Sequence, residues 1–116
     1  MLDDAAFAAQ WVESRDRARP RGERALRHEL AQKGIDQGVV AAVLEDRAAD
    51  VDPDGVPPDA LAAGRLLARH GPSLARVADP RVRRHRAYAL LARNGFDPDV
   101  CRSAVDQFLA DPPDED

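Results

Sequence analysis

Apolar residues recur along this chain at the three- and four-residue spacing of amphipathic helices. No useful length alternates between apolar and polar positions, so we expect no β-strand. Glycine, proline and aspartate divide the helical pattern into six segments. The expected helices span about 3–17, 20–33, 36–48, 59–70, 80–94 and 97–110. The pattern therefore predicts an all-α fold.

The apolar positions inside these helices predict the core. In the first helix, Phe7 and Trp11 lie four residues apart with Ala8 and Val12 alongside, and together they form one apolar stripe. The other expected core positions are Leu26, Leu30, Val39 or Val40, Val43, Leu44, Leu61, Leu66, Leu67, Val100, Ala104, Val105, Phe108 and Leu109.

One segment of the chain occurs twice. Residues 30–36 recur as residues 91–97, a shift of 61 positions. Each copy has a glycine, which can end a helix in the left-handed conformation, and two residues later an aspartate, which can cap the next helix. Cys101 corresponds to Val40, so we interpret it as a small buried apolar residue. The duplication predicts two tandem three-helix repeats, six helices in all, in an elongated molecule.

The repeats are joined by a segment unsuited to regular structure, with three prolines, one glycine and three aspartates. The chain ends in a short acidic run that is expected to be disordered. The predicted organisation is a three-helix repeat at 1–49, a Pro/Asp-rich linker at 50–58, a three-helix repeat at 59–110 and an acidic disordered tail at 111–116.

Charge is strongly segregated, although the chain carries only −4 in total. Residues 15–33 carry a net +4 and residues 65–93 a net +7, while the remainder carries −15. Such blocks create local fields that the total conceals. Sixteen of the 17 basic residues are arginines, which suit bidentate pairing with phosphate or carboxylate. A GC-rich coding sequence would also favour arginine.

Catalytic and metal-binding patterns are missing from the sequence. The single cysteine excludes an internal disulfide and a cysteine-cluster zinc site, and the three histidines have no metal-ligand spacing. There is no phosphate-binding glycine loop or nucleophile elbow. We therefore expect no enzyme activity and no cofactor. Without a signal peptide or an apolar run of roughly 20 residues, we expect a cytoplasmic protein with no membrane partner.

A helix-turn-helix reader of duplex DNA would fit the glycine turns, but the charges argue against it. The helices that follow the turns, 36–47 and 97–109, each carry three acidic residues against one arginine. Acidic helices are repelled by the phosphates that supply most of the affinity. The basic residues lie on the middle helix of each repeat and on the segment before it, which forms either a solvated surface or a contact face for an anionic partner.

The candidate contact residues are Arg15, Arg21, Arg24, Arg27 and Lys33 in the first repeat, and Arg81, Arg83, Arg84, Arg86 and Arg93 in the second. Asp3 and Asp4 are weaker candidates. They form an adjacent carboxylate pair, but the chemistry of a helix start explains them as a cap and a first-turn residue.

Several of these residues together resemble the signature of the RecX family. The matching elements are Leu2–Ala8, Trp11-Val12, Arg15, Gly22, Leu26, Glu29-Leu30 and Lys33–Ile35, followed in the second half by an arginine-rich helix, Leu90–Arg93, Gly95-Phe96 and a closing helix. The resemblance covers nearly all of the chain to about residue 110. The resemblance begins at the acidic pair, so we expect the further N-terminal repeat that family members usually carry to be missing.

The resemblance implies tandem three-helix repeats that modulate the RecA recombinase, usually by inhibiting it, in DNA repair, recombination and the SOS response. The implied partner is the RecA filament with its single-stranded DNA, bound within the filament groove, and we expect a monomer. Two alternatives stay open at this point: a helical DNA-binding regulator and a purely structural helical-repeat adaptor.

Overall fold

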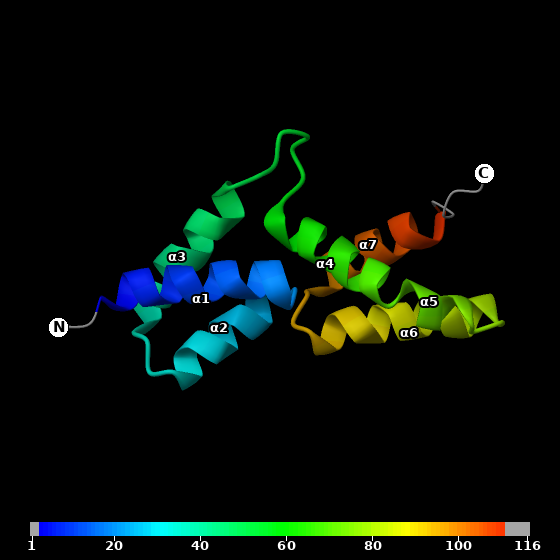
Figure 1. The fold of residues 1–116 in the computed structure, drawn as a ribbon, viewed down its shortest axis with the longest axis horizontal. Coiled ribbons are helices and arrows are strands. Elements are labelled where there is room, and N and C mark those ends of the chain that lie inside the picture. Colours follow the sequence, from blue (N-terminus) through cyan, green and yellow to red (C-terminus); the bar gives the residue numbers. More distant parts are fainter. Residues whose placement is uncertain (1–2, 111–116) are drawn as a thin grey trace.

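The computed structural model describes residues 3–110, which form seven helices and no strand (Figure 1). The helices are α1 (Asp4–Ala18), α2 (Glu23–Gln32), α3 (Gln37–Ala49), α4 (Pro58–Arg69), α5 (Gly71–Ala75), α6 (Pro80–Arg93) and α7 (Pro98–Ala110). Helices α1–α3 lie at one end of the molecule and α4–α7 at the other, with principal extents of 54 × 29 × 22 Å. The prediction of an elongated all-α molecule built from tandem three-helix units is confirmed.

The helix count of six was wrong, because the segment 71–79, expected to be a loop, contains the short helix α5. The preceding helix ends at Arg69, just before Gly71-Pro72, as its expected end at about residue 70 required. Gly71 is not among the glycines with positive φ, and Pro72 occupies the first turn of α5, where its missing N–H costs nothing. Leu74 anchors this turn in the core. The second unit therefore has three long helices and one inserted turn.

The start of the second helix also differs from the expectation. Pro20 was placed in its first turn, but α2 begins at Glu23 with Gly22 as the N-cap, and Pro20 is buried in the connection before it. Gly22 has no side chain to cap the helix. The structure replaces the missing cap with groups from the other repeat, as described below.

The duplicated turns adopt the predicted geometry. Gly34 and Gly95 have φ values of +81° and +88°, in the left-handed region. The Asp36 carboxylate accepts a hydrogen bond from the amide two residues later at 2.9 Å, and Asp97 accepts one from the amide three residues later at 3.0 Å. Local chemistry alone is enough to set these helix ends.

Two hydrophobic clusters lie in the molecule, one in each repeat. The first consists of Ala8, Val12, Leu26, Leu30, Val40 and Leu44. The second consists of Ala62, Ala63, Leu66, Leu67, Leu74, Ala87, Leu90, Leu91, Phe96, Cys101 and Val105. Of the alternatives Val39 and Val40, the buried residue is Val40, and Cys101 is fully buried as predicted. Most of the other expected core residues pack against these clusters while partly exposed.

The predicted core position of Phe7 was wrong, since its side chain is 44% exposed. Ala8 and Val12 face α2 and α3, and Trp11 is only partly buried at the edge of this contact. The apolar stripe of α1 is therefore wider than the surface that its own repeat covers, and Phe7 lies on the uncovered side.

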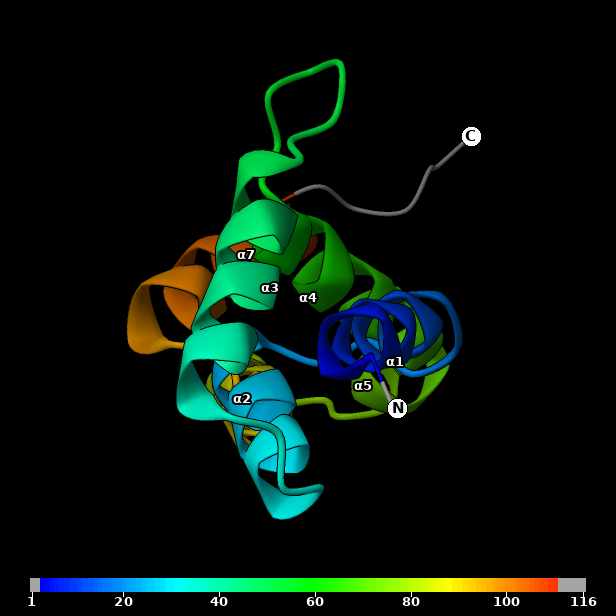
Figure 2. The ribbon, with the colours of Figure 1, turned by 90° about the vertical axis from the view of Figure 1, so that its left-hand side faces the viewer.

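The connection between α3 and α4 is neither helix nor strand, and it loops away from the helices in both views (Figures 1 and 2). Asp52 organises this connection. Its carbonyl accepts from the amide of Gly55 at 2.8 Å, and its carboxylate accepts from the amide of Val56 at 2.7 Å. The predicted acidic tail at 111–116 lies outside the described residues, and the domain boundaries stay a prediction.

The two repeats meet where α6 ends and α2 begins. The amides of Gly22 and Arg24 donate to the carbonyls of Asn94 and Gly95 at 2.9 and 3.2 Å. The amide of Glu23 donates to the Asp59 carboxylate of α4 at 3.1 Å. Three of the free N–H groups at the start of α2 are thus satisfied by the second repeat, which explains why a glycine N-cap suffices.

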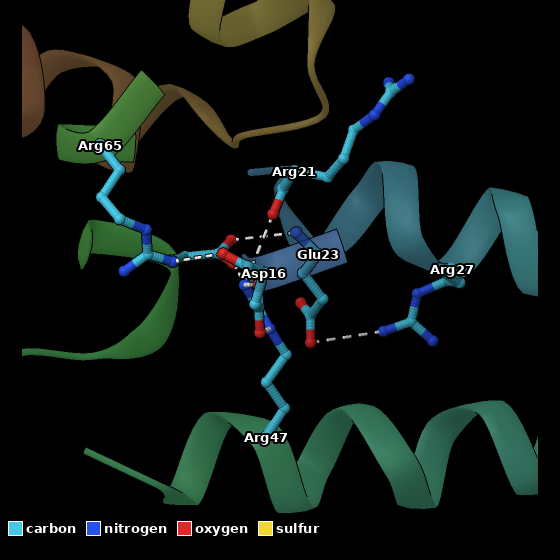
Figure 3. A network of polar contacts seen from close by, with 7 residues as sticks. Asp16, Arg21, Glu23, Arg27, Arg47 and Arg65 are labelled. Atoms are coloured by element: carbon cyan, nitrogen blue, oxygen red, sulfur yellow. Dashed lines mark hydrogen bonds and ion pairs between the residues drawn. The ribbon is translucent and has the colours of Figure 1, made fainter. Parts of the chain in front are cut away.

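Arginines close the other side of this junction. Arg65 and Arg69 of α4 donate to the carbonyls of Asp16 and Ala18 at the end of α1, at 2.9 and 3.0 Å. Arg47 of α3 is only 8% exposed and pairs with the carboxylate of Asp16 (Figure 3). It also pairs with the carboxylate of Asp59. The junction is therefore a polar network between the repeats rather than a hydrophobic contact.

The pKa of Arg47 lies above its ordinary value. Burial acts to lower it, but the hydrogen bonds and charges of Asp16 and Asp59 together outweigh that effect. The guanidinium therefore stays charged at every pH at which the protein would be studied, and the junction keeps its ion pairs.

Candidate partner-binding face

Three predicted contact residues of the first repeat gather around Trp11 and Glu29. The Glu29 carboxylate accepts from the Trp11 indole N–H at 2.9 Å and from Nε of Arg15 at 3.1 Å, and Nε of Arg21 lies 3.3 Å from it. The guanidinium of Arg15 and the ammonium of Lys33 lie 4.5 and 4.4 Å from the centre of the Trp11 ring. Both are within cation–π range, so the charges of this cluster are held in fixed positions.

Arg24 and Arg27 lie on the exposed side of α2. Arg27 is 3.7 Å from the carboxylate of Glu23 one turn earlier, in a pair that is half exposed on both sides. Such a pair is worth only a few tenths of a kcal/mol, about 0.3–0.5, so a partner can recruit this arginine at little cost. Arg24 lies at the first turn of α2, against the second repeat.

The five candidates in the second repeat divide into two groups. Arg81, Arg86 and Arg93 are exposed on α6. Arg84 forms an exposed ion pair with Asp106 of α7, and Arg83 donates to the carbonyl of Val77 through Nε at 3.0 Å and through a terminal nitrogen at 2.6 Å. Arg83 therefore has a structural use in the loop before α6, whereas the other four present their charge outward.

Helices α2 and α6 follow one edge of the molecule, end to end (Figure 1). Their contact through Asn94 and Gly95 places Arg93, in the last turn of α6, next to the helix start that carries Arg24. We call the residues Arg15, Arg21, Arg24, Arg27, Lys33, Arg81, Arg84, Arg86 and Arg93 the basic track. Arg15 belongs to α1, Arg21 to the connection after it, and Lys33 caps the end of α2, whereas the other members lie on α2 and α6. The fold brings α2 and α6 end to end.

Asp3 has a clear structural role. It is the N-cap of α1, and its carboxylate accepts from the amide of Ala6 at 3.1 Å. Asp4 lies in the first turn, where a negative charge is favourable next to the helix dipole. Capping thus accounts for Asp3 without a partner, and the weaker suggestion of a contact role for the pair stays a prediction.

Sequence reasoning missed three arginines with defined partners, namely Arg47, Arg65 and Arg69. They point into the junction between the repeats rather than outward, as Figure 3 shows for Arg47 and Arg65. It also missed Glu29, which orders the first-repeat cluster. No local pattern marks these partners, because they are 8 to 51 residues apart in sequence.

The third helices present negative charge. Glu45 and Asp46 on α3, and Asp99 and Asp106 on α7, are exposed. This arrangement disfavours insertion of α3 or α7 into a duplex groove. Within residues 3–110 there is no group of acidic, histidine or cysteine side chains arranged to hold a metal ion. None of the helices in that range has the length and apolar character needed to cross a bilayer.

The fold defines a class: a tandem three-helix-repeat protein with exposed arginines on α2 and α6. Comparison with known proteins gives the family. Residues 3–44 match the profile described as "RecX, second three-helix domain". The chain belongs to the RecX family.

Relatives named "Regulatory protein RecX" match most of the chain. The protein of Chlorobium phaeobacteroides is 35% identical over 94% of this chain and 64% of its own length. That of Thermobifida fusca is 36% identical over 83% of this chain and 48% of its own length, and that of Mycobacterium sp. strain JLS is 34% identical over 95% and 58%. The chain thus spans between 48% and 64% of these relatives. No solved structure matches the chain.

Proposed function

We propose that this protein is a non-enzymatic regulator of the RecA recombinase that acts in the cytoplasm as a monomer. It binds the filament that RecA forms on single-stranded DNA and lowers the activity of that filament. Family membership supports the regulatory role, since the relatives are named as regulatory proteins. The observation that carries the proposal is the basic track, which continues from one repeat to the next along α6 and α2.

The shape and charge of the partner support this proposal. A nucleoprotein filament offers rows of phosphates and acidic protein surface in a long groove. An elongated ligand fits such a groove when its positive charge runs along its length and faces inward. Exposed arginines of the basic track occur on both α2 and α6, which lie end to end, and we expect the exposed acidic residues of α3 and α7 to face away from the filament.

The most direct test follows ATP hydrolysis by RecA on single-stranded DNA as purified protein is added. Lowered hydrolysis supports the proposal. Tight binding to a defined duplex without an effect on RecA would replace it with a DNA-binding regulator, and no effect in either assay would leave a structural adaptor. Filament binding, and with it the inhibition, should weaken as salt rises. The logarithm of the binding constant should fall with the logarithm of the salt concentration with a slope of about 0.7 to 0.9 for each phosphate contacted.

Charge reversal locates the face. Arg24→Glu with Arg27→Glu should weaken filament binding while the helical circular-dichroism signal stays unchanged, because both side chains are exposed. A matched pair of single variants, Arg27→Glu and Arg102→Glu, changes the net charge equally. Arg102 lies on α7, paired with Asp99 and outside the track. Equal binding by these two single variants across a salt titration would show that net charge matters and the assigned face does not.

A further inference from the structure

Phe7 is an exposed aromatic ring beside the basic track. Among the described residues, the large apolar side chains that are well exposed are Phe7, Val51 and Val82. Of these, Phe7 is the aromatic one, and it lies in α1 one turn after the Asp3 cap. An aromatic ring held in water on a rigid helix is a surface that a flat partner can cover at low entropic cost.

The ring is held in place by its neighbour. Phe7 stacks on Trp11 with ring centres 6.2 Å apart and planes inclined by 22°. Trp11 in turn is fixed by its hydrogen bond to Glu29 and by Arg15 and Lys33 near its ring. The cations occupy the surroundings of Trp11, so Phe7 is the ring that stays available to a ligand.

The surroundings of Phe7 favour a partner with polar edges. A shallow hollow on α1 is lined by Phe7, Gln10, Trp11, Ser14 and Arg17. Aliphatic side chains are not part of this lining, so an aliphatic group from a protein would gain little apolar contact there. An unpaired nucleobase matches it better, because its face can stack on the ring while its edge meets an amide, a hydroxyl and a guanidinium.

The charges on either side of Phe7 indicate the direction in which a bound nucleic-acid strand would run. Asp3 and Asp4 lie about one helical turn before Phe7, whereas Arg15 and Arg17 lie two to three turns after it and Lys33 approaches from the end of α2. Phosphates are repelled at the first end and attracted at the second. A strand that stacks on Phe7 would therefore run toward the end of α1 and the start of the basic track.

We propose that Phe7 is a base-stacking residue for single-stranded nucleic acid, with Arg15, Arg17 and Lys33 holding the adjoining phosphates. The inference rests on the proposed function for its biological source of strand, since the RecA filament supplies unpaired bases. The contact itself is a property of this surface and is measurable without RecA.

The test uses a fluorescently labelled oligothymidylate and its fluorescence anisotropy at low salt. Base–aromatic stacking is worth about 1–3 kcal/mol by alanine substitution, which is roughly 5- to 140-fold in affinity, so Phe7→Leu should weaken binding by a large part of that factor. Phe7→Tyr, which keeps the ring, should retain affinity within about twofold. Leucine keeps much of the apolar area, so the pair of variants separates stacking from general hydrophobicity. Val51→Ala removes an exposed apolar group elsewhere and should have no effect.

Trp11 is the single tryptophan of the chain and lies against Phe7, so quenching of its fluorescence by unlabelled oligothymidylate would locate the strand. Undiminished binding by Phe7→Leu, or no quenching at saturation, would overturn the inference. The RecA hydrolysis assay is read separately. If the protein inhibits RecA but strand binding does not depend on Phe7, this inference is wrong and the proposed function stands. If strand binding depends on Phe7 but RecA is unaffected, this inference is supported and only the proposed function is wrong.

Discussion

Replacing single glycines at the junction should measure how tightly the two repeats are joined. A Cβ built on Gly95 would lie 2.4 Å from both the amide nitrogen and the Cβ of Ala25 in the other repeat. A Cβ on Gly22 would lie 2.4 Å from the Gly95 carbonyl oxygen. Gly34, at the corresponding position of the first repeat, has open space around it. The three positions separate backbone strain from steric overlap.

The expected costs follow from these geometries. Gly34→Ala carries only the strain of a non-glycine residue at positive φ, about 1–2 kcal/mol. Gly22→Ala has an ordinary φ of −82°, so its cost comes from overlap with backbone that cannot turn aside, about 1–3 kcal/mol. Gly95→Ala combines both effects and should cost about 2–5 kcal/mol. Gly95→Ala should therefore lower the free energy of unfolding most, and Gly34→Ala clearly less.

Urea unfolding followed by circular dichroism provides the free energies, and Trp11 fluorescence reports on the first repeat within the same titration. If Gly95→Ala cost no more than Gly34→Ala, the contact between α2 and the α6–α7 turn would not exist in solution. In Gly22→Ala or Gly95→Ala, the Trp11 fluorescence and the circular-dichroism signal could change at different urea concentrations. Such a biphasic transition would show that the two repeats unfold independently in the variant.

Three further perturbations address the network, the core and the helix start. Arg47→Met leaves two partly exposed carboxylates beside each other and should cost about 2–4 kcal/mol in the same unfolding assay, less than for fully buried partners. Burial, together with the charge of Asp97, raises the pKa of the Cys101 thiol. Labelling of this thiol by a thiol reagent at pH 8 should therefore proceed only through unfolding and accelerate sharply in urea. Rapid labelling of the native protein would contradict the buried position. Asp3→Asn with Asp4→Asn preserves a comparable cap, so unchanged filament binding would reduce the pair to a structural role, and a loss would give it a contact role.

Features set by neighbouring residues could be predicted from the sequence. Gly34 and Gly95 each precede an apolar residue and an aspartate, and the helix ends follow from the freedom of glycine and the reach of a carboxylate over three residues. The burial of Cys101 followed from its alignment with Val40. These inferences succeed because the interactions responsible span only a few positions.

Features that depend on distant partners could not be predicted. Periodicity placed Phe7 on the apolar side of α1, but the crossing of α2 and α3 decides which part of that stripe is covered. The helix before Gly71-Pro72 ends as predicted, at Arg69, but the sequence did not indicate the new turn α5, whose Leu74 is buried in the core. The contact role of Arg83 stays a prediction, and the sequence did not indicate that its guanidinium also donates to the Val77 carbonyl, because the path of the loop before α6 decides that contact.

The junction and the basic track depend on one another. Because the carbonyl end of α6 meets the amide end of α2, the dipoles of the two helices align head to tail, and the exposed arginines of both helices keep a fixed spacing across the junction. A ligand that spans both repeats then binds without first ordering them, which lowers the entropic cost of association. Gly95→Ala should therefore weaken filament binding although it removes no charge, and more strongly than Gly34→Ala, which leaves the junction intact. Equal binding by both variants, measured where both are fully folded, would mean that each repeat binds independently and that the alignment of α6 with α2 has no part in recognition.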